Sequence, residues 1–551
     1  MASNLPILCI DKIFGNLKND HKTLHSCIFV NSNWCRQGIP LLWYNPFQTA
    51  SNPALLIDTL FLCLPKVEKQ KYGLIPKNND WISISASSDN QDDDDLLKPM
   101  FAYDSLIKKF SLGDLYAAIN EWCSPVPHKR TSRKLLKTFC QRLIEEAKLE
   151  ELELDFDNLE FFNNDEWGCD SKEWDIFQWS GAKDSCSNLQ RMQISGEYPA
   201  EILYSAAQLC SNIESISVTL NPYSQLTFTS KTLSDSNVFE RIDYLIVLIA
   251  AQFTLTSITI SRYHDWESSQ DLQRLFDALV LHSPFLKYIE LCDINLSEQF
   301  MILDILSIHQ QLEQIVFRNC SLLDSNYYPR LSVEAFSKLT VLEFRNTFVV
   351  KSVISILMLH AASSLRELVL VGSVSFDTIE FLQDYGSNNP NIEKFEVYLS
   401  FDQLPSILHT INDDEEKDEE DDNVYDNEND NSDECDDGEQ ERWDNYDNRN
   451  GFDKFVSGLW QWLPSELRYL EINTTLEFSP MAIQSFLMET KAEIQILKFP
   501  ISTCISDNHL EVIVDYGFVE YLDISNARFV TKNGIENARK DINIIEHVFY
   551  E

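Results

Sequence analysis

Apolar residues recur along the chain in the pattern L-x-x-L-x-L, in which Ile, Val, Phe or Met replaces some of the leucines. The clearest copies begin 26, 27, 26 and 27 residues apart, at Leu286, Leu312, Leu339, Leu365 and Ile392. Alternating apolar residues indicate a short strand with one buried face. Between copies, stretches such as 352–363 have apolar residues at i, i+3 and i+4, as amphipathic helices do. Each period therefore predicts one strand and one helix, and the chain is predicted to be α/β.

Weaker copies extend this array in both directions, at Leu149, Leu189, Ile213, Leu255, Leu467, Ile494 and Val519. In one clear copy, Leu312, Ile315 and Phe317 are followed by Cys320 and Leu322. This order resembles L-x-x-L-x-L-x-x-[N/C]-x-L, the pattern of leucine-rich repeats. The resemblance implies a curved solenoid of about a dozen repeats over residues 149–551, with the residues after 529 as a terminal cap.

Within each predicted strand, the residues between the apolar positions are expected to lie on the face opposite the core, the concave face of such a solenoid. Carboxylates stand beside arginines there, which favours a target of mixed charge; a merely solvated face is the alternative. The candidate target-binding residues are Arg318, Glu343, Arg345, Glu396, Tyr398, Glu471, Asn473, Lys498 and Asp523.

Residues 1–47 have a different pattern. An apolar helical stripe of Ile10, Ile13, Phe14 and Leu17 follows a start at Leu5-Pro6. A second stripe is predicted from Leu24, Cys27, Val30 and Trp34, and a short third element ends at Trp43. Three helices in about 45 residues are too few to bury a strong core alone. Exposed apolar surface is therefore expected, and on a small module it marks a docking face.

The order of these residues resembles the F-box, whose motif is L-P-x-E-I-L-x-x-I-F-x-Y-L followed by V-C-x-x-W and P-x-L-W. Leu8, Cys9 and Asn16 stand where that motif usually has Glu, Ile and Tyr. The residues at matching positions are Leu5, Pro6, Ile10, Ile13, Phe14, Leu17, Val30, Trp34, Pro40, Leu42 and Trp43.

An F-box joined to leucine-rich repeats resembles the substrate-receptor subunits of cullin–RING ubiquitin ligases. The resemblance implies that the F-box residues bind a helical adaptor subunit and that the repeats hold an unknown target protein. It also implies that no side chain of this chain catalyses ubiquitin transfer. The alternative is a three-helix cap that docks to nothing.

Residues 48–148 show neither pattern strongly. Helix-like apolar stretches occur at 54–64, 105–122 and 132–146. We interpret this part as a helical connector, although degenerate early repeats fit equally well.

One interval between copies is much longer, because 75 residues separate Ile392 from Leu467. Within it, residues 413–441 have 18 acidic side chains and one lysine. Such a composition cannot bury apolar surface, so residues 412–450 are predicted to be a disordered insertion that interrupts one repeat. Two roles stay open: a solvated segment that maintains solubility, and a binding segment for a basic partner.

The whole chain has 44 basic and 87 acidic residues, a net charge of −43. That charge repels phosphate backbones, which argues against nucleic-acid binding and favours a target with a basic surface. The 13 cysteines include no C-x-x-C pair, and the first residues lack the pattern of a signal or membrane helix. We therefore expect reduced thiols, a cytoplasmic or nuclear location and no membrane partner.

Motifs of catalysis are absent from the sequence. Neither G-x-x-x-x-G-K-[ST] nor G-x-G-x-x-G occurs, and the pair His21 and His25 lacks the adjacent Glu of a zinc protease. We expect no cofactor, no metal and no catalytic residue. Besides the ligase adaptor, two functions stay open: an acidic leucine-rich-repeat chaperone for basic proteins, and a scaffold without ligase contact. The internal position of the acidic stretch counts against the chaperone, whose acidic tract is normally a terminal tail.

Overall fold

The structure is a computed structural model, and contacts divide the chain into two compact units, Met1–His264 with Gln270–Phe285 and Asp265–Ser269 with Leu286–Glu551. Leu5, Leu322 and the predicted insertion 412–450 lie outside the described residues. The structure describes residues 6–17, 20–49, 52–65, 67–69, 74–77, 80–83, 99–123, 129–157, 159, 171–196, 198–220, 234–262, 269–296, 302–320, 331–347, 351–372, 391–399, 453, 456–459, 463–475 and 477–545.

Strands β3 to β16 of the described residues form one parallel sheet in chain order, which confirms the predicted α/β class. Strands β8 to β12 begin 26, 27, 26 and 27 residues apart, so the period of the sequence is the period of the strands. A separate antiparallel pair consists of β1 (Leu74–Lys77) and β2 (Asp80–Ser83). The sheet strands are β3 (Lys109–Ser111), β4 (Glu151–Asp155), β5 (Arg191–Ser195), β6 (Ser215–Leu220), β7 (Ser257–Arg262), β8 (Tyr288–Cys292), β9 (Gln314–Arg318), β10 (Val341–Arg345), β11 (Glu367–Val371), β12 (Lys394–Leu399), β13 (Tyr469–Thr474), β14 (Ile496–Lys498), β15 (Tyr521–Asp523) and β16 (Asn543–Ile545).

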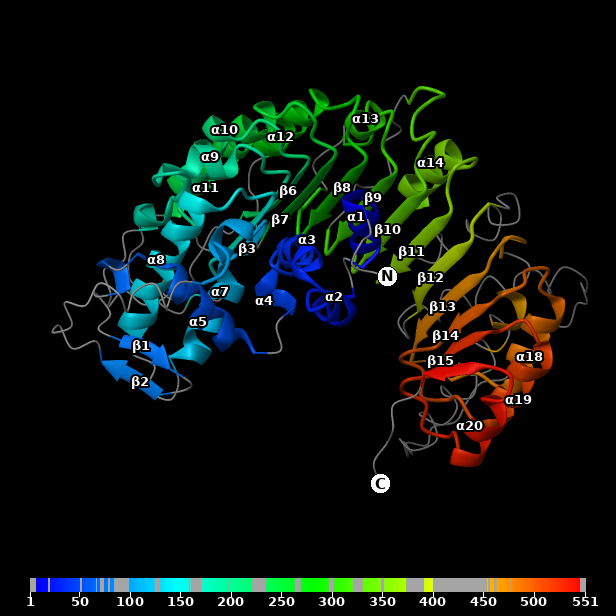
Figure 1. Ribbon diagram of the computed structural model, residues 1–551. Helices are drawn as coiled ribbons and strands as arrows, with labels where there is room; N and C mark the ends of the chain where they lie inside the picture. Colours follow the sequence, from blue (N-terminus) through cyan, green and yellow to red (C-terminus); the bar gives the residue numbers. More distant parts are fainter. Residues whose placement is uncertain are drawn as a thin grey trace, which may run out of the picture. The chain divides into compact units, whose positions relative to one another are not determined.

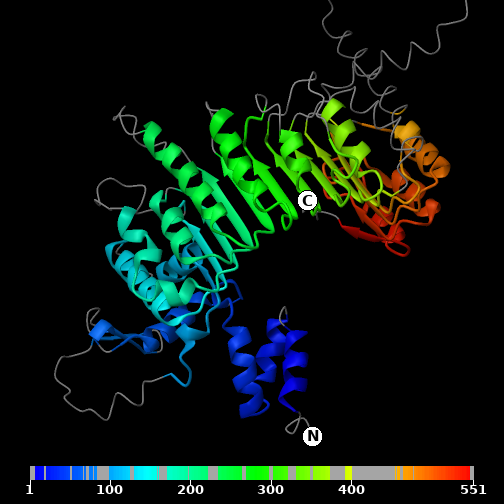
Figure 2. The ribbon, with the colours of Figure 1, turned by 90° about the horizontal axis from the view of Figure 1, so that it is seen from above.

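The helices that connect the described strands of the parallel sheet lie on one face of the sheet within each unit; α1 to α3 precede the sheet and do not belong to this layer. The opposite face, which none of these connecting helices covers, is called the helix-free face. In Figure 1, α9 to α12 lie on one side of β4 to β7, and α18 to α20 lie on one side of β13 to β15. The view from above in Figure 2 shows the same layering within each unit. The helices are α1 (Ile7–Gly15), α2 (His21–Cys27), α3 (Ser32–Leu42), α4 (Pro46–Thr49), α5 (Pro53–Cys63), η4 (Tyr103–Leu106), α7 (Leu112–Trp122), α8 (Lys129–Glu146), η6 (Ser171–Trp174), η7 (Ile176–Gln178), α9 (Ala182–Cys186), α10 (Glu201–Leu209), α11 (Ser234–Ala250), α12 (Ser269–Val280), α13 (Ile302–Ser307), α14 (Lys351–Ala361), α18 (Pro480–Glu489), α19 (Asp507–Tyr516) and α20 (Lys532–Ala538).

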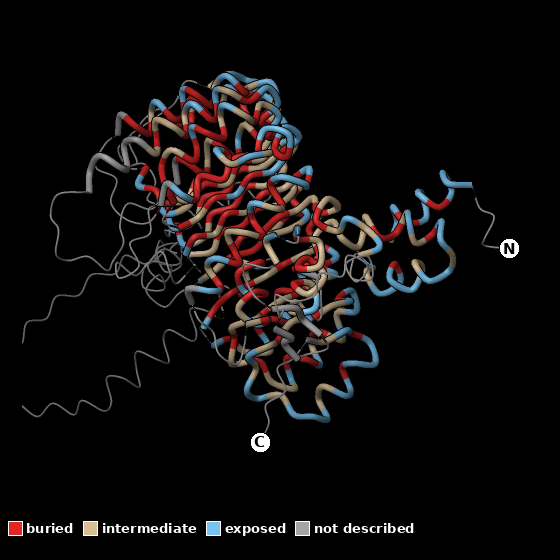
Figure 3. Tube along the Cα trace, turned by 60° about the vertical axis from the view of Figure 1, so that its left-hand side comes forward, coloured by how far each residue is buried: buried red, intermediate tan, exposed pale blue. Residues whose placement is uncertain are grey.

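The core of each unit lies between the sheet and its helices. In β8, Ile289 and Leu291 are fully buried, while Glu290 between them points to the helix-free face. Figure 3 shows buried residues along the strands, separated by partly exposed ones. Strands β9 to β11 depart from this alternation, because their central residues on the helix-free face, Val316, Glu343 and Val369, are buried as well.

The turn after each of β8 to β11 is built in the same way. Asp293, Asn319, Asn346 and Gly372 follow these strands with positive φ angles of 57°, 51°, 48° and 135°, a conformation that Asn, Asp and Gly tolerate best. Cys320, predicted at the turn position, is 3% exposed, and its thiol donates to the carbonyl of Leu291 over 3.2 Å. The side chain thus fastens one turn to the preceding repeat.

The N-terminal residues form three short helices, but the predicted division between the second and third is wrong. The stripe from Leu24 to Trp34 was expected in one helix; instead α2 ends at Cys27 and α3 begins at Ser32. Asn31 causes the break, because its side-chain oxygen caps α3 by accepting hydrogen bonds from the N–H groups of Asn33 and Trp34. The predicted third element is the last part of α3, with Pro40 inside the helix.

The sheet begins within residues 48–148, the range interpreted as a helical connector. Of the predicted helix 105–122, residues 112–122 form α7, and residues 105–106 belong to the short helix η4. Ser111 caps α7 by accepting a hydrogen bond from the N–H of Asp114, and the preceding residues form β3, which pairs with β4. Later in the chain, β12 and β13 are neighbouring strands that pair directly, although residues 400–452 between them lie outside the described part.

Candidate functional site

A small apolar core holds the N-terminal helices together. It consists of Ile10, Phe14, Leu24 and Trp34, with Leu17 and Leu42 partly buried against it. The rings of Phe14 and Trp34 meet edge to face, with 5.3 Å between their centroids. Gly38 allows α3 to approach closely, since a Cβ at this position would lie 2.6 Å from Cγ2 of Ile28.

Apolar side chains that this core does not use are exposed on the same helices. Ile7 and Leu8, in the first turn of α1, are 59% and 81% exposed. Ile13 is 37% exposed, and Phe29 and Val30, in the turn between α2 and α3, are 74% and 49% exposed. A small module with this much accessible apolar surface has a candidate docking face.

The residues that resemble the F-box motif therefore fall into two groups. Ile10, Phe14 and Trp34 are core residues, whereas Pro6, Ile13 and Val30 are exposed. Leu17, Pro40, Leu42 and Trp43 are half-buried. Ile7 and Phe29 were not predicted as site residues, and Leu8 was noted only as a departure from the motif. All three lie within apolar runs, 5–10 and 27–30, in which the sequence alone does not separate exposed residues from core residues.

The predicted target-binding residues lie on the helix-free face of the second unit. They occupy β9, β10 and β12 to β15, and the register aligns Glu396 with Glu471, Glu471 with Lys498, and Lys498 with Asp523. The structure thus brings them into neighbouring columns. Glu290 was not predicted as a site residue, although it occupies the equivalent position, between the apolar residues of the strand, in the repeat copy that begins at Leu286.

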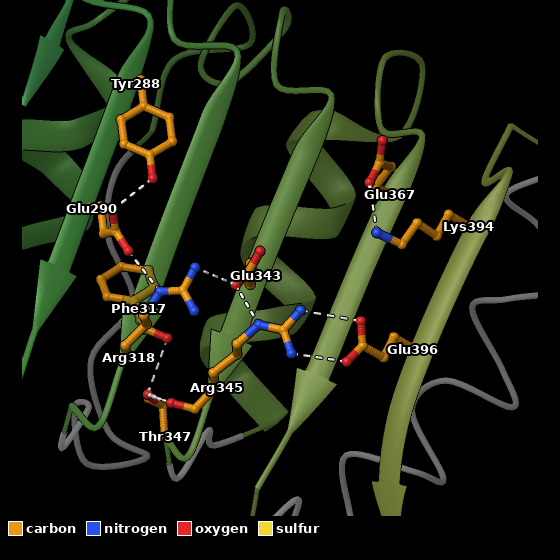
Figure 4. A network of polar contacts seen from close by, with 10 residues as sticks. All are labelled: Tyr288, Glu290, Phe317, Arg318, Glu343, Arg345, Thr347, Glu367, Lys394 and Glu396. Carbon is orange, nitrogen blue, oxygen red and sulfur yellow. Dashed lines mark hydrogen bonds and ion pairs between the residues drawn. The ribbon is translucent and has the colours of Figure 1, made fainter. Parts of the chain in front are cut away.

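Two arginines and three carboxylates of this face form a continuous network across β8 to β12 (Figure 4). The Nε atom of Arg318 donates to Glu290 over 2.6 Å, and its Nη2 atom lies 3.0 Å from Glu343. Arg345 donates from Nε to Glu343 over 2.5 Å and from both terminal nitrogens to Glu396, over 2.9 and 3.1 Å. The last contact is the bidentate geometry in which Arg binds a carboxylate most specifically.

This network explains the unusual burial on the helix-free face. Glu343 and Glu396 are only 8% and 5% exposed, and burial of such carboxylates is tolerable because arginines compensate their charge. Val369 stands between them in register and is 1% exposed, so the ion pair of Arg345 crosses above it. The charged residues of this face were predicted to bind a target. In the structure, the arginines and carboxylates of this network also bind one another.

A second polar cluster surrounds Tyr469 on β13. Its hydroxyl donates to Glu471, which also accepts from Asn473 over 2.9 Å and pairs with Lys498 at 3.9 Å. The ammonium groups of Lys394 and Lys498 lie 5.2 and 5.1 Å from the centre of the Tyr469 ring. Lys394 also donates to Glu367 over 3.2 Å.

Tyr288 and Tyr469 on this face remain hydrogen-bond donors. Burial, followed by the adjacent Glu290, raises the pKa of Tyr288, whose hydroxyl donates to that carboxylate over 2.7 Å. Burial and Glu471 raise the pKa of Tyr469 in the same way. Asp523 accepts from the N–H of Ser525 over 3.1 Å, and Tyr398 is half-buried at the neighbouring column.

Within the described ranges, no group of three or more His, Cys, Asp or Glu side chains is arranged to hold a metal ion. None of the helices described has both the length and the apolar character needed to span a bilayer.

Comparison with known proteins adds no identity to these observations. The chain matches no model of a known protein family, and it matches no curated protein.

Proposed function

We propose that this chain is the substrate-recognition adaptor of a cullin–RING ubiquitin ligase of the F-box type. The N-terminal helices bind the helical adaptor subunit, and the helix-free face of the sheet binds a target protein. The observation that carries this proposal is the set of exposed apolar side chains on α1 and in the α2–α3 turn, on a module that is joined to a repetitive parallel sheet.

The physical argument rests on the cost of leaving these side chains in water. Each Å² of apolar surface buried on binding contributes about 25 cal/mol, so a partner that covers Leu8, Phe29 and Val30 gains several kcal/mol before entropy costs. The buried Phe14–Trp34 pair gives this surface a rigid support. A rigid support of this kind lowers the ordering cost of binding.

Positioning is the only chemistry that the proposal assigns to the chain. A target on the sheet and a transferring enzyme linked through the adaptor react as if at high concentration, because one complex holds both. The proposed target contacts are the exposed atoms of two groups of residues: the network of arginines and carboxylates across β8 to β12, and the cluster around Tyr469. Ion pairs within each group fix the positions of these side chains before a target binds.

This proposal is tested by measuring how tightly the helical adaptor binds variants of this chain with substituted surface residues. We compare the wild-type chain with the Ile13→Glu, Val30→Glu variant and with a control variant, Met100→Glu, Val333→Glu. The control exchanges two apolar residues outside the module that are 83% and 94% exposed. Wild type and control should bind the purified helical adaptor equally, and the module variant at least about tenfold more weakly.

Two results contradict the proposal. One is a wild-type chain that does not bind the adaptor; the other is a module variant that binds as tightly as the wild type. Circular dichroism of each variant checks that the helices are retained, since all four exchanged positions are exposed.

A further inference from the structure

Consecutive strands from β3 to β7 in the first unit, and from β8 to β15 in the second, are joined by the same backbone contact. One carbonyl, from the residue just before a strand, accepts the N–H groups of two consecutive residues at the start of the next strand. The carbonyl of Lys108, for example, accepts from Glu150 and Glu151 over 2.8 and 3.0 Å. That of Glu150 accepts from Gln190 and Arg191 over 2.8 and 3.1 Å. The contact recurs in the second unit, from Lys287 to Gln495. This pair of hydrogen bonds therefore connects each of these repeats to the preceding one.

Tyr44 makes this same contact, although it belongs to no strand. Its carbonyl accepts the N–H groups of Lys108 and Lys109, at the start of β3, over 3.1 and 2.9 Å. Tyr44 directly follows the C-cap of α3, Trp43. The residue that ends the N-terminal helices thus stands where the preceding repeat of the array would stand.

The side chain of Tyr44 extends the attachment to the next strand. Its hydroxyl lies within hydrogen-bonding distance of Glu151 and Glu150, at 3.2 and 3.4 Å. Glu151 is also paired with Lys109 at 3.7 Å and with Arg191. Burial, with these two carboxylates, raises the pKa of Tyr44, so the hydroxyl stays a donor throughout the physiological range.

A second contact supports α3 from the side. The ring of Trp43 packs on that of Tyr103, with 4.4 Å between the centroids. Tyr103 lies in η4, five residues before Lys108. Trp43 and Tyr44 therefore connect the end of α3 to two successive parts of the first unit.

We infer that Tyr44 is a positioning residue that fastens the N-terminal helices, in register, to the open edge of the parallel sheet. It satisfies the N–H groups of an edge strand, which otherwise invite pairing with another chain. It also transmits the orientation of α3 to the sheet. The functional half of this inference rests on the proposed ligase function: the Tyr44 contacts limit how a partner bound to the helices can move relative to the first unit, and the effective concentration in ubiquitin transfer depends on that freedom.

Two matched insertions test the inference. One places Gly-Ser-Gly-Ser between Trp43 and Tyr44, and the control places the same four residues after Asp93. Single-molecule energy transfer between dyes on non-natural residues at the exposed positions 22 and 188 reports how widely the distance varies. A third variant, Tyr44→Phe, removes only the hydroxyl contacts to Glu150 and Glu151.

The expected result is one narrow distance population for wild type and control, and a broad one for the insertion after Trp43. Tyr44→Phe should lie between them. In a reconstituted reaction at saturating adaptor, the insertion after Trp43 should slow transfer to a bound target about tenfold, because it lowers the effective concentration. Affinity for the target should be unchanged, whereas a general folding defect would lower affinity and rate together.

A wild-type distance distribution as broad as that of the Trp43 insertion would overturn the inference. So would narrow distributions for all variants. The distance measurement needs no adaptor, so failure of the proposed function leaves it interpretable; absent adaptor binding with a narrow wild-type distribution contradicts only the ligase assignment.

Discussion

Single side chains on the helix-free face of the second unit owe their positions mainly to one another. Arg345 joins Glu343 on its own strand to Glu396 two strands away, and Glu396 is almost completely buried. A buried carboxylate without its arginine retains the cost of desolvation and loses the compensating attraction. The network is therefore a structural element of the face as well as part of the proposed target surface.

The exchange Arg345→Met should lower the free energy of unfolding by about 2–3 kcal/mol, because it removes the bidentate partner of the buried Glu396, whereas Glu343 keeps its ion pair with Arg318. Adding Glu396→Gln should recover part of the loss. Lys287→Met is the control: it removes a 2.8 Å ion pair with Glu313 whose side chains are 52% and 47% exposed. That pair should contribute less than about 1 kcal/mol. Urea unfolding measures all three, and equal losses for Arg345→Met and Lys287→Met would refute this explanation.

A histidine buried between repeats should make stability depend on pH. His282 is 3% exposed, and its Nε2 atom lies 2.8 Å from the carbonyl of Ile249. Burial lowers the pKa of His282 below its ordinary value of 6.5. The unfolded chain therefore takes up a proton at a pH where the folded chain does not, and stability is lost as pH falls below about 6.5.

The variant His282→Gln isolates this effect from that of the many carboxylates. Gln252 already makes comparable contacts in the preceding repeat, to the carbonyl of Cys210 over 2.9 Å. Unfolding midpoints of wild type and variant, measured at about pH 7.5 and about pH 5.5, should diverge in favour of the variant at the lower pH. A constant difference between them would show that His282 does not titrate on unfolding.

At the scale of elements, the N-terminal helices depend on one close approach. The missing side chain of Gly38 brings α3 within van der Waals distance of Ile28 and Phe14. Gly38→Val should separate the helices, destabilise the module by about 1–3 kcal/mol and abolish adaptor binding. Gly15→Ala is the matched control, because nothing lies within 4 Å of a Cβ at that position. The thermal unfolding temperature and the adaptor affinity are measured for both variants. Loss of adaptor binding in both variants would contradict a specific role of close packing at Gly38.

Strands β4 to β15 were predictable from the sequence, and their ion pairs were not. The apolar alternation in copies such as 339–344 marks both the strand and its buried face, since the period of a strand is 2. The columns of Glu343 and Arg345 follow from the same register. The pairing of Arg345 with Glu396, 51 residues apart, depends on how far a side chain reaches across a neighbouring strand, which no local pattern contains.

The boundaries of short elements were also beyond the sequence pattern. The stripe from Leu24 to Trp34 keeps helical spacing across a turn, so periodicity alone could not locate the break that the Asn31 cap creates. β3 was missed because three residues are too few to show alternation. Its position is set instead by a tertiary contact with the carbonyl of Tyr44.

At the scale of the whole molecule, the chain has two surfaces of different chemistry. The N-terminal helices expose apolar side chains, whereas the helix-free face of the second unit exposes charged and hydroxyl groups. The chain has a net charge of −43, of which residues 413–441 contribute −17. Binding through the apolar surface should resist salt, and binding through acidic residues should weaken steeply with salt. Salt dependence therefore separates the ligase adaptor from an acidic chaperone.

The most direct test is a calorimetric titration of the purified full chain with the purified helical adaptor, at about 0.1 M and about 0.5 M salt. The account predicts one adaptor per chain, a Kd on the order of 1 μM or tighter, and affinities at the two salt concentrations that differ by less than about threefold. No binding at either salt concentration, or binding that disappears at the higher one, would contradict it.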